Sequence, residues 1–270
     1  MAVEVCRIEL MADNISRLAL DVSDCSYAKV DQKWNGKQVC APFNRIYVLE
    51  KGEGILVTET ETVVMRPGMA YLVPAGILLD FYCPASMEKY FFHLNLYKPD
   101  RYDLFFGMKQ IGVLPYRAEQ RERLKRNLYG GGYVNLLAVK QELYGLLMEF
   151  AAAYLPAGMD VPVYSEPIVD TIRYIRRNLS AKLQLEELSD RLFVSRNYLS
   201  QQFRCEVGVT MWQYITDQLM MEAQKRLSQT DESIGEISHR LGYDDQCYFS
   251  RRFKQLCGVS PVQYRKMMKP

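Results

Sequence analysis

The sequence predicts a two-domain α+β protein, with an N-terminal β-barrel flanked by helices and an all-α C-terminal domain built from two helix-turn-helix units. Three observations predict this fold. Short β-rich segments alternate with Gly and Pro turns from about Val39 to Leu96. A helical periodicity then replaces them. The last third of the chain repeats itself, and a length of 270 residues suits about two domains.

The composition excludes several classes of protein. Apolar residues make up 49% and charged residues 24%, which is typical of a globular chain rather than a disordered, collagen-like or disulfide-scaffold protein. With 34 basic and 32 acidic residues, net charge alone indicates neither a nucleic acid nor a membrane partner. The N-terminus lacks a signal pattern and no apolar stretch is long enough to span a bilayer, so we expect a cytoplasmic protein.

Signatures of catalysis are absent from the sequence. There are two histidines, and the seven cysteines show no C-x-x-C spacing, so few residues are available as metal ligands. No G-x-S-x-G, P-loop or G-x-G-x-x-G motif occurs. The sequence therefore predicts neither an enzyme nor a bound cofactor or metal.

The N-terminal strands are short and closely spaced. Turns at 51–54, 66–68 and 74–76 contain Gly or Pro, which interrupt regular structure. Six segments between and beside them are expected to be strands: Arg45–Glu50, Ile55–Thr58, Thr62–Met65, Met69–Val73, Ile77–Tyr82 and Tyr90–Leu96. Such a series is typical of a sandwich or barrel.

Two helices are expected to follow, Ala118–Leu128 and Asn135–Tyr154, separated by three consecutive glycines. The second carries an apolar stripe at helical spacing, made of Leu136, Val139, Leu143, Leu146, Leu147 and Phe150. The stripe suits either a dimer seam or packing against the barrel. The Pro- and Gly-containing loop after it predicts an N-terminal domain of 1–155, a linker of 156–164 and a C-terminal domain of 165–270. Ser165 is expected to cap the next helix.

The C-terminal domain contains two copies of one unit. Leu185–Leu192 matches Ile234–Leu241 at an offset of 49 residues, and Tyr198–Tyr214 matches Tyr248–Tyr264 at an offset of 50. Each copy is expected to be a short helix, a turn and a second helix. Gly242 suits the turn of the second copy. The N-cap of the second helix is expected to be Ser195 in the first copy and Asp244 or Asp245 in the second. Their apolar faces are expected to be Leu199 and Phe203 in the first copy, and Phe249, Phe253 and Leu256 in the second.

The other face of each second helix is polar. These faces comprise Arg196, Asn197, Ser200, Gln201 and Arg204 in the first copy, and Gln246, Ser250, Arg251 and Lys254 in the second. Arg suits guanine, and Gln or Asn suits adenine, in the major groove of DNA. Solvated faces of a small bundle are the alternative, which the repetition of the pattern disfavours. A continuous helix over Trp212–Leu227 would be a rigid spacer between the two units.

These C-terminal residues resemble the AraC family of bacterial transcription regulators. The resemblance is carried by Ile234, Gly242-Tyr243, Tyr248-Phe249, Arg251, Phe253-Lys254, Gly258, Ser260-Pro261 and Tyr264-Arg265. It implies a domain with two helix-turn-helix units that binds double-stranded DNA. It also places Arg196, Asn197, Ser200 and Gln201, and Gln246, Cys247, Ser250 and Arg251, at DNA-contacting positions, although a Cys247 thiol is a weak hydrogen-bonding group.

The N-terminal segment resembles the cupin-type sensor domain of that family, through Gly52-Glu53-Gly54, Arg66-Pro67-Gly68 and Pro74-Ala75-Gly76. Leu79 occupies the position of a cupin metal histidine, so no metal is expected. The candidate ligand-lining residues are Trp34, Lys37, Arg45, Tyr47, Phe81, Phe91 and His93. By resemblance to sugar-binding relatives, Lys37, Phe81 and Phe91 would contact a sugar. Because the segment Ile77-Leu78-Leu79 is apolar, two alternatives remain: an apolar ligand or no ligand at all.

The sequence is thus interpreted as a regulator that binds specific DNA and responds to a small molecule. The resemblance implies a homodimer and, for an activator, a contact with RNA polymerase. Two alternatives remain: a constitutive dimeric regulator without an effector, and a cupin-type enzyme.

Overall fold

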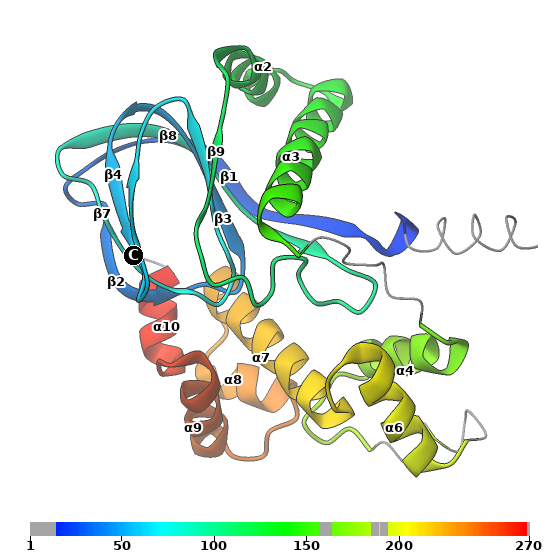
Figure 1. Cartoon of the computed structure of the whole chain (residues 1–270). Helices are drawn as coiled ribbons and strands as arrows, with labels where there is room; N and C mark the ends of the chain where they lie inside the picture. Colours follow the sequence, from blue (N-terminus) through cyan, green and yellow to red (C-terminus); the bar gives the residue numbers. More distant parts are fainter. Residues whose placement is uncertain (1–14, 157–163, 185–188, 190–193, 269–270) are drawn as a thin grey trace, which may run out of the picture. The chain divides into compact units, whose positions relative to one another are not determined.

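The computed structural model describes residues 15–156, 164–184, 189 and 194–268. Contacts within the chain divide it into two compact units, Ser16–Met159 and a unit containing Asp160–Pro270 (Figure 1). The predicted linker 156–164 lies almost wholly outside the described residues. The division of the chain at this linker therefore remains a proposal.

The first unit is an antiparallel barrel of two sheets. One has the strand order β1-β8-β3-β6-β9 and the other β2-β7-β4-β5. The strands are β1 (Ala19–Asp31), β2 (Asn35–Cys40), β3 (Asn44–Gly52), β4 (Gly54–Val57), β5 (Thr62–Met65), β6 (Met69–Val73), β7 (Leu78–Tyr82), β8 (Ser86–Tyr97) and β9 (Gly112–Pro115). All six predicted strands are present, and the predicted β-barrel with flanking helices is confirmed.

The two-residue period of the strands separates two cores. On β3, Ile46 and Val48 face a core shared with the flanking helices, whereas Tyr47 and Leu49 belong to the core between the sheets. β8 pairs with β3 so that Arg45 lies opposite His93 and Tyr47 opposite Phe91. The barrel interior is therefore lined by alternate residues of these two central strands.

Three strands were not predicted from the sequence. β1 is an edge strand paired with β8 along its whole length, yet it is rich in Asp and Ser and mostly exposed. β2 contains an irregularity between Gly36 and Val39, where Gln38 has a φ of 53°. β9 has only four residues. Edge position and short length both remove the apolar alternation that marks a half-buried strand.

Helices α2 (Ala118–Tyr129) and α3 (Tyr133–Tyr154) cover the outer face of the five-stranded sheet (Figure 1). Leu143, Leu146, Leu147 and Phe150 are buried in that core, so most of the predicted stripe packs against the chain's own barrel. Leu136, at the start of the stripe, is instead 62% exposed. The alternative of a dimer seam along Leu143 and Leu147 is therefore wrong, because these side chains are already covered.

In its described residues the second unit contains helices and no strands, as predicted. Its helices are α4 (Glu166–Arg177), α6 (Arg196–Val207), α7 (Met211–Gln229), α8 (Ile234–Arg240), α9 (Gln246–Cys257) and α10 (Pro261–Met268). Ser165 is the N-cap residue of α4, but its hydroxyl donates to the Glu206 carboxylate (2.7 Å) instead of accepting from the helix. This bond and the Ser165 amide, which donates to the same carboxylate, tie α4 to α6. Among the described residues, no helix is both long and apolar enough to cross a membrane.

Candidate DNA-binding interface and barrel site

The first candidate recognition helix is α6. Ser195 caps it, since its hydroxyl accepts a hydrogen bond from the Tyr198 amide (3.2 Å). Leu199 and Phe203 are buried beneath it, as predicted. The predicted DNA-facing side chains Arg196, Asn197, Ser200, Gln201 and Arg204 are all exposed. The helix thus buries one face and leaves the candidate face accessible.

The second candidate recognition helix, α9, has the same organisation. The Asp245 carboxylate caps it by accepting from the Cys247 amide (2.7 Å). Phe249 and Phe253 are buried beneath the helix. Of the predicted contact residues, Gln246, Arg251 and Lys254 are exposed and Ser250 is half-buried; Cys247 is also exposed.

The prediction that Leu256 belongs to the core beneath α9 is wrong. Leu256 is 41% exposed, and the neighbouring Cys257 is buried in its place. Both positions lie near the apolar face, because residues three or four apart on a helix share a side. Gln224 of α7 donates to the Cys257 sulfur (3.4 Å), so the approach of α7 selects the cysteine.

The repeat extends to packing and turn geometry. Phe203 meets Tyr214 edge to face with ring centroids 5.5 Å apart, and the matching Phe253 and Tyr264 do so at the same distance. Gly208 and Gly258 both end their helices in the left-handed conformation. Most of Leu185–Leu192 lies outside the described residues. The turn that follows it nevertheless contains the same backbone hydrogen bond as the matching turn of the second copy. Val194 donates to the Ser189 carbonyl (3.1 Å), as Tyr243 does to that of Ser238 (3.0 Å).

Helix α7 links the two helix-turn-helix copies (Figure 1). It packs on α6 of the first copy and on α8, α9 and α10 of the second. It contains all of the predicted spacer and has 19 residues, a length of about 28 Å at the usual helical rise. The Glu232 carboxylate fixes its end, pairing with Arg226 (3.0 Å) and Arg240 (2.8 Å). The hydrogen bond from Arg226 holds the pKa of Glu232 below its usual range. This pairing joins α7 to α8.

Most candidate ligand residues of the barrel are at least partly buried. Arg45 is 6% and Tyr47 3% exposed, and Trp34, Phe81, Phe91 and His93 are half-buried. Trp34 packs against Phe81 with ring centroids 4.4 Å apart. Lys37 is exposed, so it does not join the buried group. Leu79, which occupies the cupin metal-histidine position, is fully buried in the core between the sheets.

Lys89 was not among the predicted residues, although it belongs to the barrel interior. It is 2% exposed, and its ammonium lies 3.5 Å from the centre of the Trp34 ring and 4.1 Å from that of Tyr47. Burial holds the pKa of Lys89 well below its usual range, and the Arg45 charge lowers it further. The signal was present in the sequence, because a two-residue period puts Lys89 on the same face of β8 as Phe91 and His93.

Burial, with the charges of Arg45 and Lys89, also lowers the pKa of His93 to about 3. His93 stacks on Phe43 with ring centroids 4.5 Å apart, and its Nδ1 lies 3.6 Å from the exposed Asp24 carboxylate. Within the described parts of the chain, no group of three or more His, Cys, Asp or Glu side chains is arranged to hold a metal.

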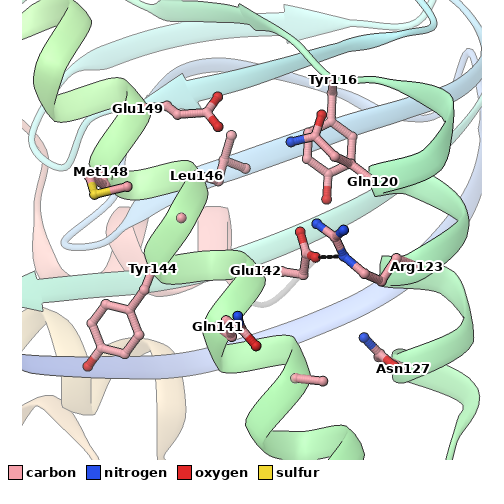
Figure 2. Close-up of a pocket in the computed structure, with 12 residues that line it drawn as sticks. Tyr116, Gln120, Arg123, Asn127, Gln141, Glu142, Tyr144, Leu146, Met148 and Glu149 are labelled. Atoms are coloured by element: carbon pink, nitrogen blue, oxygen red, sulfur yellow. Dashed lines mark hydrogen bonds and ion pairs between the residues drawn. The ribbon is translucent and has the colours of Figure 1, made fainter.

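A groove of about 560 Å³ lies between α2 and α3 (Figure 2). Arg123 of α2 and Glu142 of α3 form an ion pair across it, drawn as a dashed line. Beside the groove, α3 exposes an apolar face that the sequence analysis did not identify. Tyr133, Leu137, Tyr144 and Met148 recur at helical spacing and are 38–86% exposed.

Comparison with known proteins supports this reading. A family profile described as a helix-turn-helix domain matches residues 188–267. The HTH-type transcriptional regulator YisR of Bacillus subtilis is 27% identical over 86% of this chain and 88% of its own length. The arabinose operon regulatory protein of Salmonella typhimurium is 26% identical over 80% of each chain. Over most of its length the chain therefore resembles transcription regulators of the AraC family.

The fold of the chain also has a counterpart among solved structures. An apo structure of ToxT from Vibrio cholerae matches with a TM-score of 0.53 over 92% of this chain and 98% of that chain, at 14% sequence identity. At such identity the likeness concerns the fold alone. The chain therefore combines a β-rich N-terminal unit with a C-terminal helix-turn-helix unit, as the sequence predicted.

Proposed function

We propose that the protein is a DNA-binding transcription regulator that reads its operator by placing α6 and α9 in successive major-groove segments of double-stranded DNA. The observation that carries the proposal is the pair of accessible polar faces at matching positions of the repeat. Each face lies on a helix whose opposite side is buried in the core, so the backbone that carries the polar groups is held in place. Rigid presentation lowers the entropy lost on binding.

Within these faces, Arg251 and Gln201 are the proposed base readers. The Arg251 side chain is 76% exposed. Its guanidinium lies 4.0 Å from the Asp245 carboxylate, so the ion pair is weak and leaves Arg251 available for DNA. Arg bonds guanine O6 and N7 together, and Gln bonds adenine N6 and N7. The remaining residues of the two faces, including Lys254 and Arg204, would supply further base contacts or bind phosphates.

The test uses the full chain and DNA sites selected from a random pool. Arg251→Ala and Gln201→Ala should each weaken binding by about 1–3 kcal/mol and relax base preference at one position, in different halves of the site. Arg252→Ala is the matched control. Arg252 is half-buried and donates to Gln255 (3.1 Å), so its loss removes the same charge without a base contact. Wild-type preference in both test variants would refute the assignment.

We propose a homodimer formed through the exposed face of α3. Contiguous apolar surface outside a core indicates an interface. Leu137→Asp with Met148→Asp should give a folded monomer in sedimentation and weaker operator binding, because linked DNA-binding modules gain effective concentration. Leu143→Asp, on the buried face, should instead unfold or aggregate the protein. A dimer that survives the double change would contradict the proposed face.

We propose that a small-molecule effector bound in the N-terminal barrel regulates DNA binding. If the protein activates transcription, RNA polymerase is a further proposed partner. Binding to chromosomal DNA implies the cytoplasm. We propose no enzymatic activity, since the named relatives are transcription regulators. A constitutive regulator is the second candidate. A barrel ligand that changes operator affinity would exclude it.

A further inference from the structure

The barrel interior contains buried cationic groups without a matching carboxylate. Lys89 and Arg45 are 2% and 6% exposed. In the described part of the chain, neither side chain forms a hydrogen bond or an ion pair with an acidic residue. Their charges lie over aromatic rings instead. Lys89 lies over Trp34 and Tyr47, and Arg45 lies over Phe43, with its Cζ 5.7 Å from the ring centre.

Strand register explains why these cations meet. Arg45 lies opposite His93, and Lys89 lies opposite Leu49, on the central strands β3 and β8. Alternation directs all three basic side chains to the inside of the barrel, together with Tyr47 and Phe91. Mutual repulsion follows, since Arg45 lowers the pKa of both Lys89 and His93. Packing alone offers no reason for this, because a buried unpaired charge is destabilising.

A hollow on the barrel surface lies near these groups. A hollow of about 540 Å³ opens on the barrel beside the turn between β1 and β2. Trp34 and Met87 line it, and both also belong to the apolar core between the sheets. Trp34 therefore adjoins the hollow, and its ring centre lies 3.5 Å from the buried Lys89 ammonium. A ligand that displaces this ring would reach Lys89 directly.

We propose that the barrel binds an organic anion, with its negative head on Lys89 and Arg45 and its apolar or aromatic body against Trp34, Tyr47 and Phe91. The inference rests on the proposed effector function and names the chemical class of the effector. Charge selects the class, since a carboxylate or phosphate head would supply the missing counter-charge and accept from both donors. Aromatic walls select an apolar body, because they offer few groups to a polyhydroxylated ligand. A neutral sugar, expected by resemblance, would leave the cations unpaired.

The test measures thermal shift and calorimetric binding of the full chain with matched probes. Phenylacetate and phenyl phosphate carry the two kinds of anionic head, and 2-phenylethanol is the neutral analogue. Hexanoate and hexanol form an aliphatic pair. At least one anion should raise the melting temperature and bind at least tenfold more tightly than its neutral analogue. The comparison between phenylacetate and phenyl phosphate identifies the preferred head.

Lys89→Met should weaken binding of that anion at least tenfold and leave its neutral analogue unaffected. It should also raise the melting temperature without ligand, because it replaces an unpaired buried ammonium by an apolar chain of similar length. Lys51→Met, which removes an exposed lysine of the same barrel, should bind the anion as the wild type does. If Lys89→Met does not fold, Arg45→Met provides the same comparison.

The proposal is overturned if no anion binds, if neutral analogues bind equally well, or if neither Lys89→Met nor Arg45→Met weakens anion binding. Operator binding by the wild-type chain, measured in parallel, separates these failures. Intact operator binding with no anion bound would overturn the anionic effector and leave the DNA-binding function standing. A neutral ligand that binds the barrel and changes operator affinity would overturn only the chemical class.

Discussion

Gly242 offers a quantitative test of how the second helix-turn-helix unit is held together. It lies between α8 and α9 with a φ of 83°, in the left-handed region that favours glycine. A Cβ there would overlap the Ser180 hydroxyl oxygen and lie 3.1 Å from the Ala181 amide nitrogen. That amide donates to the Leu241 carbonyl (2.8 Å), so the neighbouring backbone is fixed. Gly242→Ala therefore adds both strain and a steric overlap.

The magnitude follows from a matched glycine. Gly258 has a φ of 80°, and a Cβ there would meet nothing within 4 Å. Left-handed backbone costs an alanine about 1–2 kcal/mol, of which the stiffer unfolded chain returns about 0.4–1 kcal/mol. Gly258→Ala should thus lose about 1 kcal/mol of unfolding free energy. Overpacking adds about 1–3 kcal/mol, so Gly242→Ala should lose about 2–4 kcal/mol.

Urea unfolding provides the assay. The chain has two tryptophans, one in each unit, so Trp212 fluorescence in a Trp34→Phe background reports on the C-terminal unit. Gly242→Ala should also weaken operator binding more than Gly258→Ala, because Gly242 sets the entry of α9. Equal losses of stability in the two variants would refute the close approach to Ser180 and Ala181.

Three further predictions concern the barrel and the linker. Because His93 has a pKa of about 3 when folded and about 6.5 when unfolded, its contribution to stability is complete above pH 6.5 and declines as the pH falls toward 3; urea midpoints of His93→Gln should decline less than those of the wild type over this range. Limited proteolysis should cut first within 156–162 and release a C-terminal fragment that binds DNA, more weakly than the intact chain; a first cut inside either unit would contradict the proposed boundary. Dialysis against a chelator should leave melting temperature and operator binding unchanged, and a stoichiometric metal that resists chelation would revive the enzyme alternative.

The sequence determined much of this protein through local chemistry. Ser195 and Gly242 mark the limits of helices, because caps and left-handed turns depend on a few neighbouring atoms. Phe203 and Phe253 could be assigned to the core because the repeat gives the same pattern twice. The alternating strands Thr62–Met65 and Met69–Val73 were likewise readable, since the period and the turns that bound them are local properties.

Tertiary structure decided which of several equivalent faces is covered. Leu137 and Leu147 are both apolar residues of α3, yet only Leu147 meets the sheet, and the approach of α7 buries Cys257 instead of Leu256. The two-residue period of β8 puts Lys89 on the same face as Phe91 and His93, but the pairing of β8 with β3 decides which side chains Lys89 meets inside the barrel. Burial and the sharing of charge depend on residues distant in sequence, and pairing across the barrel is what brings Lys89 close to Arg45.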